Sequence, residues 1–326
     1  MKKVLIVIAL LGLLPHASAD YIHWVDFRLS APVLRSALEL DMASQGGEQP
    51  LDWIDILALA AAWRGGTGVT VADTQRAAQA LRGDTPPERL PGMAGRYFSY
   101  YREAYGAALG GLVGHFAIRR TDPQTGEAEW IPAYGLKAFS PIAAGYPWLH
   151  YPDFGAQRSY GYARPHLGND ILGALGTPIC AVEGGTVEAL GWNRYGGWRI
   201  GIRSDDRKRY YYYAHLRKDT PYAEGLAVGQ RVQAGEVIGF MGRTGYSAQE
   251  NVNNIETVHL HFGLQLIFDE SQKECDSEIW IDVYPIIELL ASHCSSVARD
   301  PQTGRWERLY PYCDLDAEPL RSAAAR

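Results

Sequence analysis

Two histidines stand two positions apart in the stretch TVHLHFG, residues 257–263. The stretch is otherwise typical of a β-strand, in which side chains alternate between the two faces. His259 and His261 would then point to the same side, with roughly 6.5–7 Å between their Cβ atoms. Histidine pairs in strands also occur at surface or hydrogen-bonded positions without chemistry. A metal site therefore requires further ligands elsewhere in the chain.

Two such candidates lie in the stretch PHLGNDILG, residues 165–173. His166 and Asp170 are four positions apart around Gly168, a spacing that a bent loop or strand end can close around one ion. Imidazole and carboxylate groups are ligands that Zn²⁺ accepts, and three protein ligands leave the fourth tetrahedral position for water. The spacing alone has low specificity.

A further histidine follows a run of tyrosines in RYYYYAHLRKD, residues 209–219. If this run is a strand, Tyr211, Tyr213 and His215 share one face. We expect Tyr211 and Tyr213 either to pack in the core or to contact substrate beside His215. Several histidines thus fall in three segments that Gly-rich hairpins separate, as expected when strands converge on one site.

The elements that must position these residues change in type along the chain. Residues 20–120 have a helical pattern, in which Ser30 and Asp52 can each cap a helix. The second of these helices, WIDILALAAAW, is nearly all apolar and is predicted to be buried. Three tyrosines spaced four apart form one stripe on a later helix, which is more typical of a core than of a ligand site. They are Tyr97, Tyr101 and Tyr105.

Short runs rich in Val, Ile, Tyr and Trp follow, with Gly, Pro and Asp turns between them. The turn DPQTGE at 122–127 indicates a linker or a first hairpin, and one more helical pattern spans 281–290. We predict an α+β protein: a helical domain over 20–120, a mainly antiparallel β-sheet domain over 121–290, and a polar C-terminal tail over 291–326.

Composition excludes some classes of protein. The chain has 326 residues, of which 47% are hydrophobic and 21% charged, as in soluble globular proteins. Its formal net charge is -6 and it has no long basic run, which makes nucleic acid an unsuitable partner.

The first 19 residues have the features of a secretory signal peptide. Lys2 and Lys3 precede an apolar run over 4–14, and Ala17-Ser18-Ala19 provides a cleavage site. An uncleaved anchor is the alternative, but the run is shorter than the ~20 residues that cross a bilayer. We expect processing after Ala19, no membrane span afterwards, and an extracytoplasmic location in the periplasm, in the cell wall or as a secreted protein.

All four cysteines follow this leader, in a compartment where disulfides can form. Four cysteines allow three connectivities. We predict a bridge between Cys294 and Cys313, whereas Cys180, within the apolar TPICAV, is predicted to be a small buried side chain.

Five motifs in order resemble the zinc-dependent peptidases of the LytM and lysostaphin type, the M23 peptidases. The motifs are HLGND, GTPICAVEGGTVEALG, YYAHL, VGQRVQAGEVIGFMGRTG and HLHFGLQL. The resemblance spans about 138–268, and DFGAQRSYG at 153–161 is similar to a Phe-Gly-x-Arg lead-in of that family. It implies an antiparallel sheet crossed by a substrate groove, and peptidoglycan peptide cross-links as the substrate class. It leaves the helical N-terminal region unexplained.

The same resemblance implies a role for each of five residues. His166, Asp170 and His261 correspond to the zinc ligands, and His215 and His259 to the two catalytic positions that do not bind metal. Zinc lowers the pKa of a bound water toward ~7, and a free histidine can accept its proton or hydrogen-bond the developing oxyanion. The sequence leaves open which of the two histidines is the base.

These features predict an exported zinc endopeptidase that cuts peptide bonds in bacterial cell-wall cross-links. One alternative is a non-catalytic protein of the same fold that binds the wall or activates another hydrolase, and the complete ligand set argues against it. Another is a structural metal site in a binding module, which would not require His215 and His259. The bond cleaved, the role of the helical region and the oligomeric state stay open.

Overall fold

The computed structural model describes residues 24–122, 124–273, 275 and 277–317. The predicted signal peptide, residues 1–19, lies outside the described residues. Within that part of the chain, no helix combines the length and the apolar character that crossing a membrane requires.

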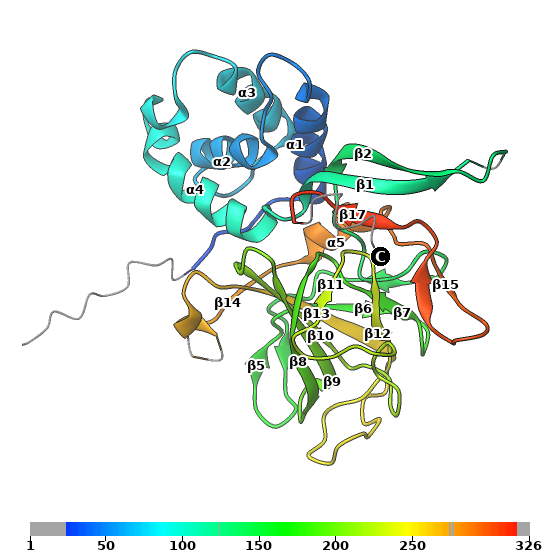
Figure 1. The fold of residues 1–326 in the computed structure, drawn as a ribbon. Helices are drawn as coiled ribbons and strands as arrows, with labels where there is room; N and C mark the ends of the chain where they lie inside the picture. Colours follow the sequence, from blue (N-terminus) through cyan, green and yellow to red (C-terminus); the bar gives the residue numbers. More distant parts are fainter. Residues whose placement is uncertain (1–23, 123, 274, 276, 318–326) are drawn as a thin grey trace, which may run out of the picture.

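The first quarter of the described chain is helical, as predicted, and one more helix follows the last strand of the main sheet (Figure 1). The helices are α1 (Ala31–Ser44), α2 (Trp53–Arg64), α3 (Val71–Leu81), α4 (Met93–Leu109) and α5 (Tyr284–Leu290), with one-turn 3-10 helices η1 (Pro87–Arg89) and η2 (Glu270–Gln272). Asp52 caps α2, because its carboxylate accepts a hydrogen bond from the Ile54 N–H. Most residues of α2 are buried, which confirms the interpretation of its apolar sequence.

Ser30 stands at the start of α1, but the cap predicted for its hydroxyl is wrong. Its side chain makes no capping hydrogen bond to a described residue. Its backbone carbonyl instead accepts hydrogen bonds from the N–H groups of Val33 and Leu34. Pro32 in the first turn fixes the backbone in a helical conformation, so the helix starts here without a side-chain cap.

The helical pattern ends earlier than predicted. α4 stops at Leu109, and β1 (Val113–Thr121) pairs with β2 (Ala128–Leu136) in an antiparallel hairpin. A side chain at Gly111, between the two elements, would collide with the carboxylate of Glu183. The DPQTGE stretch is the hairpin's turn, in which the Asp122 N–H donates to the Glu127 carbonyl.

The C-terminal segment predicted as a polar tail carries strands over its described part. These are β15 (Val297–Arg299), β16 (Trp306–Arg308) and β17 (Tyr312–Asp314). The last of them adds to β1, which gives a three-stranded sheet in the order β17-β1-β2. The sequence did not predict β17, because a strand of three residues has too few side chains to show alternation. Its partner strand, β1, also lies almost 200 positions away.

The main sheet is antiparallel, as predicted. The described strands form an eight-stranded sheet in the order β11-β8-β9-β10-β13-β6-β3, with β14 paired to β13. The bounds are β3 (Leu149–His150), β6 (Asn169–Leu172), β8 (Gly185–Asn193), β9 (Gly197–Ser204), β10 (Arg209–Ala214), β11 (Arg231–Val232), β13 (His259–Leu266) and β14 (Ile279–Ile281). Two smaller sheets pair β4 (Gln157–Arg158) with β5 (Arg164–Pro165) and β7 (Pro178–Cys180) with β12 (Val237–Phe240).

The helices and the main sheet share one apolar core. A continuous cluster of buried side chains includes Leu57 of α2, Tyr105 of α4, Val187 of β8 and Leu264 of β13. In Figure 1 the helices α1 to α4 lie together at one end of the main sheet, and the β1–β2 hairpin projects away from the molecule. The helical part is therefore packed against the sheet that carries the histidines.

The cysteines of the described chain do not form the predicted bridge. Cys294 is a free thiol that donates a hydrogen bond to the Ala291 carbonyl, so it is not joined to Cys313. Cys180 is fully buried, and burial raises the pKa of its thiol to about 12. It is a small core side chain, as predicted.

A buried ion pair joins the helical part to the sheet. The guanidinium of Arg209, at the start of β10, donates to both carboxylate oxygens of Glu183, at 2.7 and 3.0 Å. Its third nitrogen donates to the Ala107 carbonyl in the last turn of α4, at 2.7 Å. A cation is favourable at the C-terminal end of a helix, where carbonyls lack helical partners.

We predict that Glu183→Ala lowers the free energy of unfolding by up to about 3–5 kcal/mol, because it leaves the buried Arg209 paired with the partly exposed Asp206 in place of a buried counter-ion. Urea denaturation measures this change. The matched control is Arg231→Ala, which removes an exposed pair with Asp205 and should change stability by about 1 kcal/mol or less. Equal losses in the two variants would contradict a special role for the buried pair.

Candidate functional site

The candidate site lies on one face of three neighbouring strands. In the register of β13 against its neighbours, His261 stands opposite Ala214 of β10 and opposite Asp170 of β6. Residues that are directly opposite in an antiparallel sheet share a face. His259 begins the same strand on the same face, while Leu260 between them is fully buried in the core. The alternation expected from the HLH sequence is therefore confirmed.

Three side chains on this face converge on one point. His166 Nε2 lies 2.7 Å from His261 Nδ1 and 3.0 Å from Asp170 Oδ1, and the latter two atoms are 3.3 Å apart. Among the described residues, these three form the one group of histidine, cysteine and acidic side chains close enough together to hold a metal ion. The structure thus brings together the three residues singled out as ligands.

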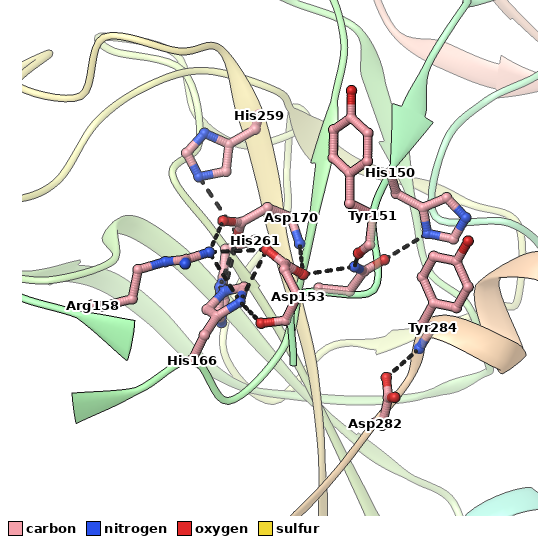
Figure 2. A network of polar contacts seen from close by, with 11 residues as sticks. His150, Tyr151, Asp153, Arg158, His166, Asp170, His259, His261, Asp282 and Tyr284 are labelled. Carbon is pink, nitrogen blue, oxygen red and sulfur yellow. Dashed lines mark hydrogen bonds and ion pairs between the residues drawn. The ribbon is translucent and has the colours of Figure 1, made fainter. Parts of the chain in front are cut away.

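Arg158 and Asp153 make hydrogen bonds to the candidate ligands Asp170 and His166 and fix their orientation (Figure 2). Arg158 donates to Asp170 Oδ2 at 2.8 Å and to Asp153 Oδ2 at 2.9 Å. The second oxygen of Asp170 is thereby occupied, which turns Oδ1 toward the histidines. Asp153 accepts from His166 Nδ1 through its carbonyl and its carboxylate, at 3.1 and 3.2 Å. When His166 carries its proton on Nδ1 alone, the Nε2 lone pair is free to face the other ligands.

Asn169 makes further hydrogen bonds that fix the position of Asp153. Its amide nitrogen donates to Asp153 Oδ1 at 2.9 Å, and its carbonyl oxygen accepts from His150 Nδ1 at 2.6 Å. The His150 ring in turn stacks on Tyr284, with ring centroids 4.3 Å apart (Figure 2). Asp153 is therefore fixed by contacts on several sides, and its orientation fixes that of His166.

Proximity of opposite charges shifts the protonation of this cluster. Burial opposes a charge on His166, but the hydrogen bonds that its ring donates to the carboxylates of Asp153 and Asp170 raise its pKa to about 9. Burial also opposes ionisation of Asp170, yet His166 and His261 hold the pKa of this carboxyl well below its usual range. The carboxylate is thus ionised and available as a ligand.

Two more imidazoles stand beside the group without belonging to it. The rings of His215 and His259 have centroids 4.7 Å apart, and His259 Nε2 lies 3.7 Å from Asp170 Oδ1. Each ring donates from Nδ1 to a backbone carbonyl, His215 to Thr244 and His259 to Thr257, both at 2.9 Å. Both Nε2 atoms are then the basic positions. Burial, followed by the two neighbouring histidines, lowers the pKa of His215 well below its usual value, which keeps this ring neutral.

The prediction that Tyr211 and Tyr213 share a face with His215 is wrong. Tyr211 and Tyr213 are buried in the core, where the Tyr211 hydroxyl donates to Glu183 and the Tyr213 hydroxyl accepts from the Val182 N–H. The cause lies at His215, which follows the end of β10 and has φ of +62°. This left-handed conformation breaks the strand's alternation, so His215 turns to the opposite face from Tyr213.

A cavity of about 250 Å³ opens beside the histidines. The tyrosines of the other face of β10, Tyr210 and Tyr212, line it together with His166, His215 and His261. Its remaining walls are mostly aromatic or charged. They come from loops and from β4, β5, β6, β9, β13 and β14: Arg158, Arg164, Pro165, Leu167, Asp170, Tyr195, Gly196, Arg199, Tyr246, Gln265, Lys273, Glu278 and Trp280. The candidate ligands therefore border a space that a peptide segment can enter.

Residues 164–274, which carry most of this site, match the model of Peptidase family M23. The chain contains an M23 peptidase domain. The match covers all three candidate ligands and both additional histidines, and it leaves the helical part and the C-terminal strands outside.

Known relatives of the M23 domain are peptidases. The L-Ala–D-Glu endopeptidase of Bacillus subtilis (strain 168) is 42% identical over 111 residues, which are 34% of this chain and 32% of the relative. The glycyl-glycine endopeptidase ALE-1 of Staphylococcus capitis is 38% identical over 98 residues, 30% of this chain and 24% of the relative. The chain thus spans about a third or less of the length of these curated relatives.

A solved structure of the catalytic domain of lysostaphin from Staphylococcus simulans is similar to part of the chain. The two are 28% identical, with a TM-score of 0.30, and the match covers 46% of this chain and 89% of that one.

Sequence reasoning missed several residues that shape the M23 site. The Phe-Gly-x-Arg resemblance includes Arg158, but nothing in the sequence indicated that its guanidinium reaches Asp170. Asp153 begins the same motif, and its contact with His166 depends on the path of the loop between them. Tyr212 was not singled out, because extending the alternation through His215 put this histidine on the face of Tyr211 and Tyr213.

We predict that Tyr211→Phe lowers the free energy of unfolding by about 1.5–3 kcal/mol, because it removes a hydrogen bond to a buried carboxylate. Tyr212→Phe, on the cavity face, should cost about 1 kcal/mol or less, since its hydroxyl accepts a hydrogen bond only from the half-buried Asn193. Denaturant titration of both variants decides the question. A larger loss in Tyr212→Phe would show that the two faces are assigned the wrong way round.

Proposed function

We propose that the chain is an exported zinc-dependent endopeptidase that hydrolyses peptide bonds in bacterial peptidoglycan cross-links. The observation that carries the proposal is the convergence of three candidate ligands and two further imidazoles at the edge of one cavity. The domain belongs to a peptidase family, and the relatives named above are an L-Ala–D-Glu endopeptidase and a glycyl-glycine endopeptidase.

The donor set fits zinc. His166 and His261 offer imidazole nitrogens and Asp170 a carboxylate oxygen, a combination used in zinc sites that keep one position open. In a tetrahedral site with bonds of about 2.0–2.1 Å, ligand atoms are roughly 3.3 Å apart. The three observed separations of 2.7, 3.0 and 3.3 Å need only a small expansion to reach this value. When bound, zinc would supply a Lewis acid that polarises a carbonyl and acidifies a coordinated water.

His215 and His259 supply the proton transfer that hydrolysis of an amide requires. A neutral imidazole with a free Nε2 can take a proton from the attacking water and return it to the leaving amine. The second imidazole can hydrogen-bond the oxygen on which negative charge develops. The carbonyls of Thr244 and Thr257 fix the orientation of the two rings, so neither has to reorganise during the reaction.

The cavity beside the histidines is the proposed substrate groove. Tyr195, Tyr212, Tyr246 and Trp280 present rings along it, which suits an extended peptide with small side chains. Helices α1 to α4 pack against the sheet and stand apart from the cavity lining, so we assign them no catalytic role. Export follows from the signal peptide expected at residues 1–19, with cleavage after Ala19.

We predict that the purified chain binds about one zinc ion and releases new peptide termini from purified peptidoglycan. A chelator should abolish the release, and added zinc should restore it. His261→Ala should lower zinc content and activity together, because it removes one of three protein ligands. His215→Ala and His259→Ala should keep the zinc but lose activity by roughly 10²–10⁴. Elemental analysis and mass spectrometry of the digest measure the two properties.

The matched control is His115→Ala, which alters an exposed histidine on β1. It should change neither zinc content nor rate. A protein stripped of metal that still cleaves peptidoglycan would contradict the zinc assignment. Loss of zinc in His259→Ala with zinc kept in His261→Ala would reverse the roles within the HLH pair.

A further inference from the structure

Arg199 of β9 lies in the same cross-strand row of the sheet as His261 and Asp170, two of the candidate ligands. In the pairing of β9 with β10, Tyr213 stands opposite Ile200. Continuing this register by one residue places Ala214 opposite Arg199, and Ala214 also stands opposite His261. Residues opposite one another share a face, so the side chains of Arg199 and His261 lie on the same side of the sheet. Both line the cavity.

One residue of β10, Ala214, stands between Arg199 and His261 in this row. Neighbouring strands are about 4.8 Å apart, so the Cα atoms of Arg199 and His261, two strands apart, are separated by roughly 10 Å. Ala214 contributes only a methyl group to the interval. On the next row of the same face, Tyr212 is flanked by Gly201 and Gly263, whose missing side chains leave room for the rings of Tyr210 and Trp280. The cavity that these rings border connects the histidines with Arg199.

Among the described residues, the guanidinium of Arg199 has no counter-ion. Within the described part of the chain its side chain makes neither a hydrogen bond nor an ion pair, and its Nε is buried without a partner. A buried guanidinium nitrogen without an acceptor is costly, and it marks a position that a ligand can complete.

The other cations along the cavity are already occupied. Lys273 pairs with Glu188 at 2.5 Å, and Arg158 pairs with Asp153 and Asp170. Arg164 donates to the Tyr160 carbonyl and stacks on tyrosine rings. Arg199 is thus the cation of the lining whose side chain lacks an acceptor among the described residues.

We propose that Arg199 binds a free carboxylate of the peptide substrate, borne by the residue next to the cleaved bond. The inference rests on the proposed function, since it takes the bond to be cut beside His261. Successive residues of a peptide are 3.8 Å apart along the chain, so a carboxylate on the residue next to the scissile carbonyl can reach Arg199 within the cavity that Arg199 and His261 share. Guanidinium and carboxylate groups match as a planar, two-point hydrogen-bonded pair. The substrate class is therefore anionic stem peptide rather than an uncharged glycyl bridge.

The test compares substrates that differ only in this charge. Peptidoglycan stem peptides with a free carboxylate on the residue beside the cleaved bond are compared with the same peptides amidated there, and with a pentaglycine bridge peptide. We expect kcat/KM for the free acid to exceed that for the amide by about ten- to a hundredfold. In Arg199→Gln, kcat/KM for the free acid should fall to the value for the amide, while kcat/KM for the amide stays unchanged. Arg199→Lys should keep part of the preference for the free acid. Zinc content and the unfolding midpoint should stay at wild-type values in both variants.

Equilibrium binding to the His215→Ala protein gives a second readout that needs no turnover. The free acid should bind more tightly than the amide, and the additional change Arg199→Gln should make the two equal. Arg231→Gln, on the edge strand β11, is the control and should keep the full preference. Equal rates and equal binding for acid and amide, a preference kept in Arg199→Gln, or faster cleavage of pentaglycine would each overturn the inference. Failure to cleave any of the three peptides, with the binding preference intact, would overturn the proposed function and leave the carboxylate site supported.

Discussion

The carboxylate of Asp170 is the interaction on which the rest of the site depends. One of its oxygens faces His166, His261 and His259, and the other accepts from Arg158. A single ionised group therefore gathers three imidazoles on one side and is held by a guanidinium on the other. The strand pairing that puts Asp170 opposite His261 makes this arrangement possible. Without the pairing of β6 with β13, the candidate ligands would lie on separate parts of the chain.

The surrounding fold keeps this row of strands rigid and one of its faces open. Leu260, Phe262 and Tyr213 fill the core side of the strands that carry the histidines. The helices add to the same core, and the Arg209–Glu183 pair fixes the end of α4 on β10. On the opposite face, Tyr212, His215 and His261 border the cavity. The same strands therefore pack tightly on one face and border the cavity on the other.

Local patterns in the sequence predicted much of this arrangement. The alternation of His259, Leu260 and His261 was sufficient to place two imidazoles on one face and a leucine in the core. The apolar helix after Asp52 and the hairpin turn at 122–127 were equally local signals. Each depends on side-chain periodicity or on turn chemistry within about ten residues, so no knowledge of distant pairing was required.

The errors arose where backbone geometry or distant partners decide the outcome. The positive φ of His215 reverses its face relative to Tyr213, and a non-glycine residue gives no sequence signal for that conformation. The pairing of β17 with β1 joins segments almost 200 residues apart, which periodicity cannot detect. Likewise, the contacts of Arg158 and Asp153 with the ligands depend on how their loop folds back over β6.

The most direct measurement is a crystal structure of the zinc-loaded protein, with the ion located by its anomalous scattering at the zinc absorption edge. We predict one strong peak bonded at about 2.0–2.2 Å to His166 Nε2, His261 Nδ1 and Asp170 Oδ1. The nitrogens of His215 and His259 should lie beyond bonding distance of the ion. A peak bonded to either of these two histidines, or no peak between the three candidate ligands, would contradict the assignment of ligands and catalytic groups.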